Sequence, residues 1–154
     1  MRNRWLHSRP AFPRLAGSLA FFTHLTDHGM LELDHLILHV RDAQASTRFY
    51  AKLLGLQHEG HAAPFEVLRV GPGTTLDLLE QPPADAAHLA FRLDRPAFEA
   101  VRARLSNLGI AFGGGPFVRD GSVAPQQGAL GWADALYFSD PDGHSIEVRT
   151  HDGR

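Results

Sequence analysis

Hydrophobic and polar residues alternate along several short segments of this chain, and two longer segments repeat apolar residues at helical spacing. In residues 45–56 and 95–110 the apolar positions recur three and four residues apart, which places them on one face of a helix. Gly55 and Gly109, each the second-last residue of its segment, predict where the helices end. Alternating or apolar segments bounded by Gly and Pro predict further strands at about 56–61, 65–71, 74–80, 111–119, 133–139 and 145–150.

The order of these elements occurs twice. His35-Leu36-Ile37-Leu38 opens one unit and His88-Leu89-Ala90-Phe91 opens the other. In each unit a strand is followed by a helix and then by three strands, so each unit is a βαβββ module. The modules cover about 31–81 and 86–150. We expect an α+β fold in which two βαβββ modules form a curled, cup-shaped sheet with the helices outside.

The 154 residues are enough for one domain with its own core, and we expect a single domain over residues 30–154. Residues 1–29 carry four arginines against Asp27 and are expected to be a flexible extension, with Met30 as an alternative start. The apolar stretch LAGSLAFF is too short to cross a bilayer and is a weak secretory signal. We therefore expect a cytoplasmic protein without a membrane partner.

Composition excludes several kinds of chemistry. The chain has no cysteine, so disulfides, thiolate metal sites and cysteine nucleophiles are ruled out. The formal net charge of -2 gives no basic surface for nucleic acid. A metal site in this chain has to be built from nitrogen and oxygen ligands.

Strand alternation predicts which side chains enter the cup. Successive side chains of a strand point to opposite faces, so the residues next to the core leucines share the other face. That face collects four residues with metal-binding side chains: His35, Asp77, His88 and Glu147. Each module contributes one histidine from its first strand and one carboxylate from its last strand.

This symmetric set of imidazoles and carboxylates is typical of a divalent cation site. We interpret His35, His88 and Glu147 as metal ligands. Asp77 is a fourth ligand, a residue that orients a ligand, or a solvated side chain, because aspartate is one methylene shorter than glutamate.

Three further residues lie on the predicted cup face. His39 can orient a substrate or a ligand, or can simply lie in the core or at the rim. Arg92 and Arg149 can bind an anionic substrate through two hydrogen bonds each, although pairing with an acidic residue is the commoner use of such an arginine. The loop from Val118 to Gly131 is either a mobile flap over the cup or an ordinary surface loop.

Residues 31–150 resemble the vicinal oxygen chelate superfamily, which comprises glyoxalase I, extradiol dioxygenases, fosfomycin-modifying thiol transferases and bleomycin-binding proteins. The resemblance lies in LDHLILHVRDAQASTRFYAKLLGL, AHLAFRLD and YFSDPDGHSIEVRT, of which the last is the most specific. It implies the paired βαβββ fold, with metal-binding positions that fall on His35, His88 and Glu147.

The resemblance also implies a reaction. One divalent metal ion per site (Ni, Co, Mn, Fe(II) or Zn) would chelate two adjacent oxygens of a small-molecule substrate as a Lewis acid. A fourth ligand at Asp77 is similar to glyoxalase I, in which a metal-bound carboxylate serves as base, so Glu147 and Asp77 are the candidate catalytic residues of a lyase or isomerase. The alternatives are a ring-cleaving Fe(II) dioxygenase, a thiol transferase, and a non-catalytic drug-binding resistance protein.

Some positions depart from the glyoxalase I pattern. Asp77 stands in place of the usual glutamate, and His39 stands where glutathione-using members tend to have an arginine. Glutathione is therefore not assigned as the substrate carrier. Family members of one-domain length generally complete their sites across a twofold axis, which implies a homodimer.

Overall fold

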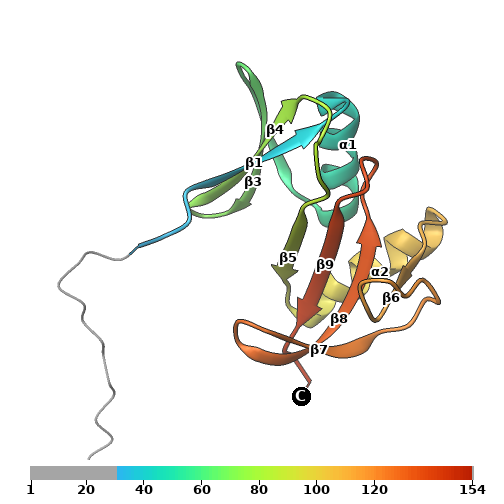
Figure 1. The fold of residues 1–154 in the computed structure, drawn as a ribbon. Helices are drawn as coiled ribbons and strands as arrows, with labels where there is room; N and C mark the ends of the chain where they lie inside the picture. The colour runs from blue at the N-terminus through green and yellow to red at the C-terminus, as the bar shows by residue number, and fades with distance from the viewer. Residues whose placement is uncertain (1–30, 154) are drawn as a thin grey trace, which may run out of the picture. The chain divides into compact units, whose positions relative to one another are not determined.

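The computed structural model describes residues 31–153, of which Glu32 onward belong to one compact unit. The expected extension at residues 1–29 lies outside the described residues. Nine strands and two helices occur in the described residues, in the order of two consecutive βαβββ modules (Figure 1). The predicted α+β fold with two such modules and a curled, open sheet is confirmed.

The first module has a four-stranded sheet in the order β1-β4-β3-β2. Strand β1 pairs with β4 in parallel, and β4, β3 and β2 pair in antiparallel fashion. The helix α1 packs on β3 and β4. The elements of this module are β1 (His35–Val40), α1 (Ala43–Leu54), β2 (Gln57–Ala62), β3 (Phe65–Gly71) and β4 (Thr74–Glu80).

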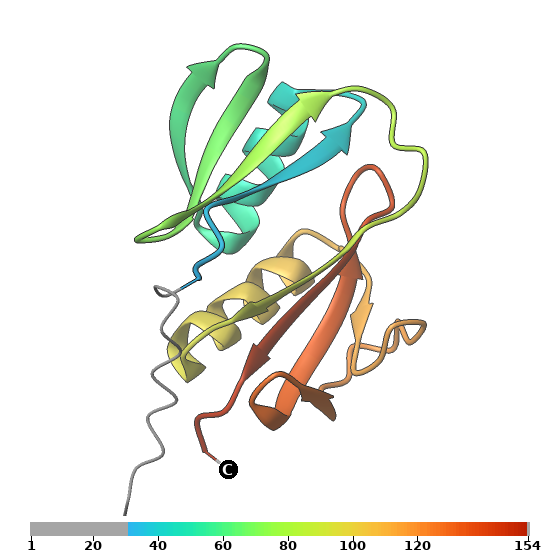
Figure 2. The same cartoon turned by 60° about the vertical axis from the view of Figure 1, so that its left-hand side comes forward.

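The second module repeats this arrangement in the order β5-β9-β8-β6, with β7 also paired to β8. Each helix lies along one face of the sheet of its own module (Figure 2). The elements of this module are β5 (His88–Arg92), α2 (Arg95–Asn107), β6 (Phe112–Gly113), β7 (Ala124–Gly128), β8 (Gly131–Ser139) and β9 (Ser145–Thr150).

The predicted strand at 111–119 and the predicted loop at 118–131 are both corrected by the structure. Phe112 and Gly113 pair with Phe138 and Tyr137, and the pairing to β8 resumes at Ala124 opposite Ala135. The second strand of this module is thus interrupted by an excursion over residues 114–123. Pro116, Gly121 and three successive glycines at 113–115 explain why regular pairing stops there.

Local sequence signals begin and end the helices. The carboxylates of Asp42 and Asp94 accept hydrogen bonds from the backbone N–H groups of Ala45 and Ala97 at the two helix starts, as N-cap residues do. Pro96 lies in the first turn of α2, where its missing N–H does no harm. Gly55 follows α1 with a φ of 77°. A residue with a side chain would be strained in this left-handed conformation.

One core joins the two modules. Tyr50 and Leu53 of α1 and Phe98, Val101 and Leu105 of α2 are almost fully buried in it. On β1 the leucine face is covered only in part, because Leu38 and Val40 are buried whereas Leu36 remains 42% exposed. The start of β1, at Leu36, is therefore not covered by the core.

The turn at Asp140-Pro141-Asp142-Gly143 also connects the modules. The hydroxyl of Tyr50 donates a 2.7 Å hydrogen bond to Asp140, and Arg41 pairs with Asp142 at 2.8 Å. The buried ring of His144 accepts a hydrogen bond from the N–H of Ala87 at Nδ1 and donates from Nε2 to the carbonyl of His39 at 2.8 Å. These contacts hold β5 and β9 in place relative to β1.

Candidate active site

The four predicted metal-binding residues occupy equivalent positions in the two modules. Asp77 of β4 pairs with Ile37, two residues after His35. Glu147 of β9 pairs with Ala90, two residues after His88. Since side chains alternate along a strand, each histidine shares a sheet face with the carboxylate of its own module, as the sequence symmetry predicts.

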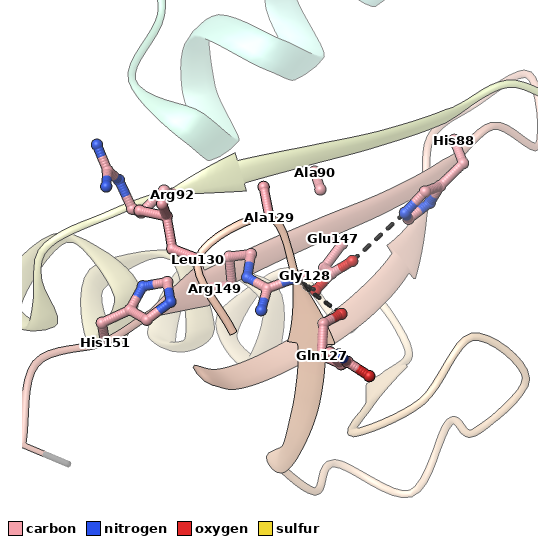
Figure 3. Close-up of a pocket in the computed structure, with 10 residues that line it drawn as sticks. All are labelled: His88, Ala90, Arg92, Gln127, Gly128, Ala129, Leu130, Glu147, Arg149 and His151. Carbon is pink, nitrogen blue, oxygen red and sulfur yellow. Dashed lines mark hydrogen bonds and ion pairs between the residues drawn. The ribbon is translucent and has the colours of Figure 1, made fainter. Parts of the chain in front are cut away.

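In the second module the histidine and the carboxylate meet. Nε2 of His88 lies 3.3 Å from Oε2 of Glu147, and the glutamate side chain is 4% exposed (Figure 3). Nδ1 of His88 lies 3.2 Å from the backbone oxygen of Ser145, an acceptor that suits a proton on Nδ1. With the proton there, Nε2 on the Glu147 side would be available as a metal ligand.

The first module repeats this orientation. Nδ1 of His35 lies 2.8 Å from Oδ2 of Asp34, and this hydrogen bond raises the pKa of the His35 imidazole. Metal-binding histidines typically use the second ring nitrogen in this way, with the proton held by a carboxylate or a carbonyl. Oδ1 of Asp77 is buried without a hydrogen-bond partner among residues 31–153.

The two pairs do not meet within one chain. His35 and Asp77 belong to the sheet of the first module and His88 and Glu147 to that of the second, and the edge strands β1 and β5 are not paired with each other. Over the described range, no three His, Asp or Glu side chains are grouped closely enough to hold a metal ion. Each histidine–carboxylate pair is called a half-site below, and in one chain the two half-sites are separate.

The donor types of both half-sites, and the donor spacing of the second, suit a divalent cation. Two donor atoms bound at about 2.1 Å to one cation in neighbouring coordination positions lie about 3 Å apart, close to the 3.3 Å between His88 and Glu147. An unpaired buried carboxylate oxygen costs about 1–3 kcal/mol, and a cation would satisfy this oxygen of Asp77. Imidazole and carboxylate donors suit Zn, Ni, Co, Mn or Fe(II).

Tyr137 of β8 belongs to the site although it was not among the predicted residues. Its ring stacks on His88 with centroids 6.0 Å apart and planes 17° apart, and it pairs in register with Glu147. Burial, followed by hydrogen bonding to Glu147, raises the pKa of Tyr137 to about 12, so its hydroxyl keeps its proton at neutral pH. Alternation along residues 131–139, with Leu136 and Phe138 facing the core, was the signal that could have identified it.

A cavity of about 440 Å³ lies beside His88 and Glu147, between β5, β9 and the β7–β8 turn (Figure 3). Its lining includes both predicted arginines. The guanidinium of Arg149 donates to Oε1 of Glu147 at 3.2 Å and to three backbone carbonyls at 3.0–3.3 Å. A Cβ on Gly128 would lie within 2.7 Å of three guanidinium atoms of Arg149, so a side chain at this position would displace the guanidinium.

The two arginines therefore differ in what they can do. Arg149 is buried and its donors are used within the chain, which fixes the β7–β8 hairpin as a wall of the cavity. Arg92 is exposed at the other side of the cavity, and no ion pair or hydrogen bond of its guanidinium occurs within the described residues. Of the two, Arg92 is the one free to bind a substrate.

His151 also lines this cavity. Both of its ring nitrogens are buried and lack a hydrogen-bond partner in the described part of the chain. Continuing the alternation Glu147, Arg149 by two residues places His151 on the same face, so the pattern contained the signal for it. The polar segment around it, after the last predicted strand, instead favoured an exposed position.

His39 lies elsewhere. It lines a separate cavity of about 220 Å³ with Ile37, Pro83 and Asp85. Its backbone carbonyl, rather than its ring, accepts the hydrogen bond from His144. The structure thus does not bring His39 together with His88, Glu147 and the arginines.

Comparison with known families agrees with this geometry. Residues 32–148 match the model of the Glyoxalase/Bleomycin resistance protein/Dioxygenase superfamily. The chain belongs to this superfamily. The matched range contains all four residues of the two half-sites.

Solved structures of the superfamily fold are also similar. "Oxidase ChaP-H2" is 30% identical with a TM-score of 0.71, and the match covers 79% of this chain and 94% of that chain. "Oxidase ChaP-H1" is 31% identical with a TM-score of 0.68, covering 79% and 97%. A glyoxalase/dioxygenase from Nostoc punctiforme is 29% identical with a TM-score of 0.61, covering 82% and 94%.

For this superfamily member, no helix among the described residues is both long and apolar enough to span a bilayer.

Proposed function

We propose that the protein is a divalent-metal-dependent enzyme that acts on a small molecule, with each active site built from two copies of the chain. His35 and Asp77 of one copy and His88 and Glu147 of the other would hold the metal. The observation that carries this proposal is the equivalent register of the two half-sites, which one chain leaves apart.

The edges of the two sheets support the assembly of two copies. Strands β1 and β5 are each at the end of a sheet and have free backbone hydrogen-bonding groups. Leu36 and Ile37 of β1 are 42% and 49% exposed. In a twofold dimer, β1 of each copy would lie against β5 of the other, which covers these apolar residues and unites the half-sites.

The side chains of the site suit proton transfer. When bound, the metal ion would polarise two adjacent oxygens of the substrate as a Lewis acid. Glu147, buried beside the protonated hydroxyl of Tyr137, would take a proton from the substrate carbon next to these oxygens and return it to the neighbouring carbon. Four ligands with two carboxylates favour a glyoxalase-I-like lyase or isomerase.

Oxygen-dependent oxidation is the second candidate function. Two of the similar structures carry the name oxidase, at 30% and 31% identity. His35, His88 and Glu147 would by themselves form the two-histidine, one-carboxylate set that Fe(II) enzymes use, with Asp77 orienting a ligand. Oxygen consumption by the Fe(II)-loaded protein would favour this reading, whereas isomerisation of a hemithioacetal without oxygen would favour the lyase.

Metal content tests the site. We expect about one divalent ion per chain in the reconstituted wild type by mass spectrometry, and loss of this ion in His88→Ala. Retention of the ion in Asp77→Ala would reduce Asp77 to an orienting residue. A wild type that stays empty with each of the five metals would contradict the proposal and favour a drug-binding protein.

Mixing two inactive variants tests the sharing between copies. His35→Ala and His88→Ala each remove one half-site, and neither should bind metal alone. After mixing at equal amounts with exchange of subunits, half of the dimers contain one of each chain and one intact site, so about one quarter of the wild-type metal should return. A site contained in one chain would recover none.

A further inference from the structure

The cavity of the second module extends well beyond the proposed metal position. His88 and Arg92 are at opposite ends of β5, four residues apart, which corresponds to about 13 Å along a strand. Both line the same cavity. Figure 3 shows His88 and Glu147 at one end and Arg92 with His151 at the other.

Between these ends the cavity is lined by small residues and by one guanidinium group. Ala90, Gly128 and Ala129 contribute no side chain beyond a methyl group. The guanidinium of Arg149 is held in place by its hydrogen bonds to Glu147 and to backbone carbonyls. Guanidinium planes stack on aromatic rings, so this stretch fits a planar, mostly apolar body.

The far end has polar groups that the chain itself does not use. The guanidinium of Arg92 is exposed and unpaired within the described residues. Both nitrogens of His151 lack hydrogen-bond partners there and are covered, and Leu130, which is 63% exposed, lines the same end of the cavity. A planar anion such as a carboxylate would satisfy both residues.

We propose that the substrate is an elongated, planar molecule with an anionic group opposite its two adjacent oxygens, and that Arg92 and His151 bind this group. This inference rests on the proposed function only for the end of the substrate that carries the two adjacent oxygens. Arg92 and His151 are specificity-determining residues in this assignment, because they lie at the end of the cavity remote from the metal ligands.

The test compares three probes that share a catechol end: 3,4-dihydroxycinnamate, its methyl ester, and catechol. Calorimetric titration of the zinc-loaded protein measures their dissociation constants. We expect the acid to bind wild type about tenfold more tightly than the ester, as for a charge-assisted hydrogen-bonded contact. His151→Ala and Arg92→Gln should abolish this preference and leave the affinity for catechol unchanged.

Matched controls change the same residue types outside the cavity. His61→Ala and Arg102→Gln should keep the preference for the acid. In addition, the ring nitrogen resonances of His151 in ¹⁵N spectra should shift on binding the acid and stay unchanged with the ester. A preference that persists in His151→Ala and Arg92→Gln, or equal binding of acid and ester by wild type, would overturn the inference.

Failure of the metal site is separable from failure of this inference. If the wild type holds no zinc, the proposed function falls, and the same titrations are made on the metal-free protein. A preference for the acid that depends on His151 and Arg92 would then support the anionic subsite by itself. Absence of any preference would overturn it.

Discussion

At the scale of single residues, chemical type alone did not decide which side chains are available for a ligand. Arg92 of β5 and Arg149 of β9 were equivalent candidates. Arg92 is unpaired in the described region, whereas both terminal nitrogens of Arg149 donate hydrogen bonds. The difference arises from the β7–β8 hairpin, which presents its carbonyls to Arg149. Arg149 is thus a structural residue of the cavity wall and a neighbour of Glu147.

Removing this guanidinium should destabilise the protein. Arg149→Met leaves the buried carboxylate of Glu147 and the hairpin carbonyls without their donor. We expect the free energy of unfolding of the metal-free protein to fall by about 3 kcal/mol, measured by urea denaturation. Arg92→Met is the matched control and should change stability by less than about 0.5 kcal/mol. Equal stability of the two variants would contradict this role of Arg149.

A buried carboxylate away from the cavity gives a pH-dependent prediction. Glu66 is 6% exposed and pairs with His58 at 2.7 Å and His61 at 3.0 Å, and it accepts a hydrogen bond from Gln44. Burial acts to raise the pKa of Glu66, but the hydrogen bonds from the two histidines outweigh it and the pKa is lowered.

A lowered folded-state pKa stabilises the protein above the ordinary carboxyl value of 4.5, and this contribution is lost as the pH falls through the folded-state pKa. Glu66→Gln should therefore be less stable than wild type at pH 7, with the difference shrinking toward pH 3. Urea denaturation of both proteins at the two pH values measures it. A difference in stability that does not change with pH would show that Glu66 stabilises the protein through packing and not through its charge. Glu99→Gln, at an exposed residue, serves as control.

At the scale of elements, turns and caps were easier to predict than interrupted strands. The bounds of β3, β4 and β9 agree with the predicted 65–71, 74–80 and 145–150, because Gly and Pro bound these strands closely. The break between β6 and β7 was not predictable, since both parts pair with β8 and the pairing depends on a distant segment.

The turn after β8 is the element that we expect to be most sensitive to substitution. His144→Ala removes a buried ring that bridges Ala87 and His39, and leaves their backbone groups unpaired. The free energy of unfolding should fall by about 2–4 kcal/mol. His39→Ala keeps the accepting carbonyl and should be much milder. Similar thermal denaturation of both variants would contradict the role of the His144 ring.

At the scale of the whole molecule, the expected unit is a dimer of about twice 16.9 kDa that completes two sites. Leu36→Arg places a charge on the exposed apolar edge of β1, and should yield a monomer that no longer binds metal. Light scattering and metal content measure these effects. Leu108→Arg, at a residue of similar exposure (43% against 42%) after α2, should remain dimeric and metal-bound. A dimeric, metal-bound Leu36→Arg would contradict the proposed interface.

The amino-acid sequence by itself was enough for the two βαβββ modules, both helices and the faces shared by the site residues on β1, β4, β5 and β9. These features depend on strand and helix periodicities of 2 and 3.6 residues and on turn residues. Such signals involve only residues that are close together in the sequence. The symmetric placement of His35, Asp77, His88 and Glu147 was also readable, because each lies at a fixed step of such a pattern.

Only the tertiary structure decided how these residues meet. It separated the two half-sites, engaged Arg149 with the hairpin, stacked Tyr137 on His88, and brought His151 to the cavity. Such outcomes depend on contacts between segments far apart in the chain, where packing and hydrogen-bond satisfaction of the whole core select one arrangement. Periodicity assigns a residue to a face of its strand, whereas the fold determines what that face is opposite to.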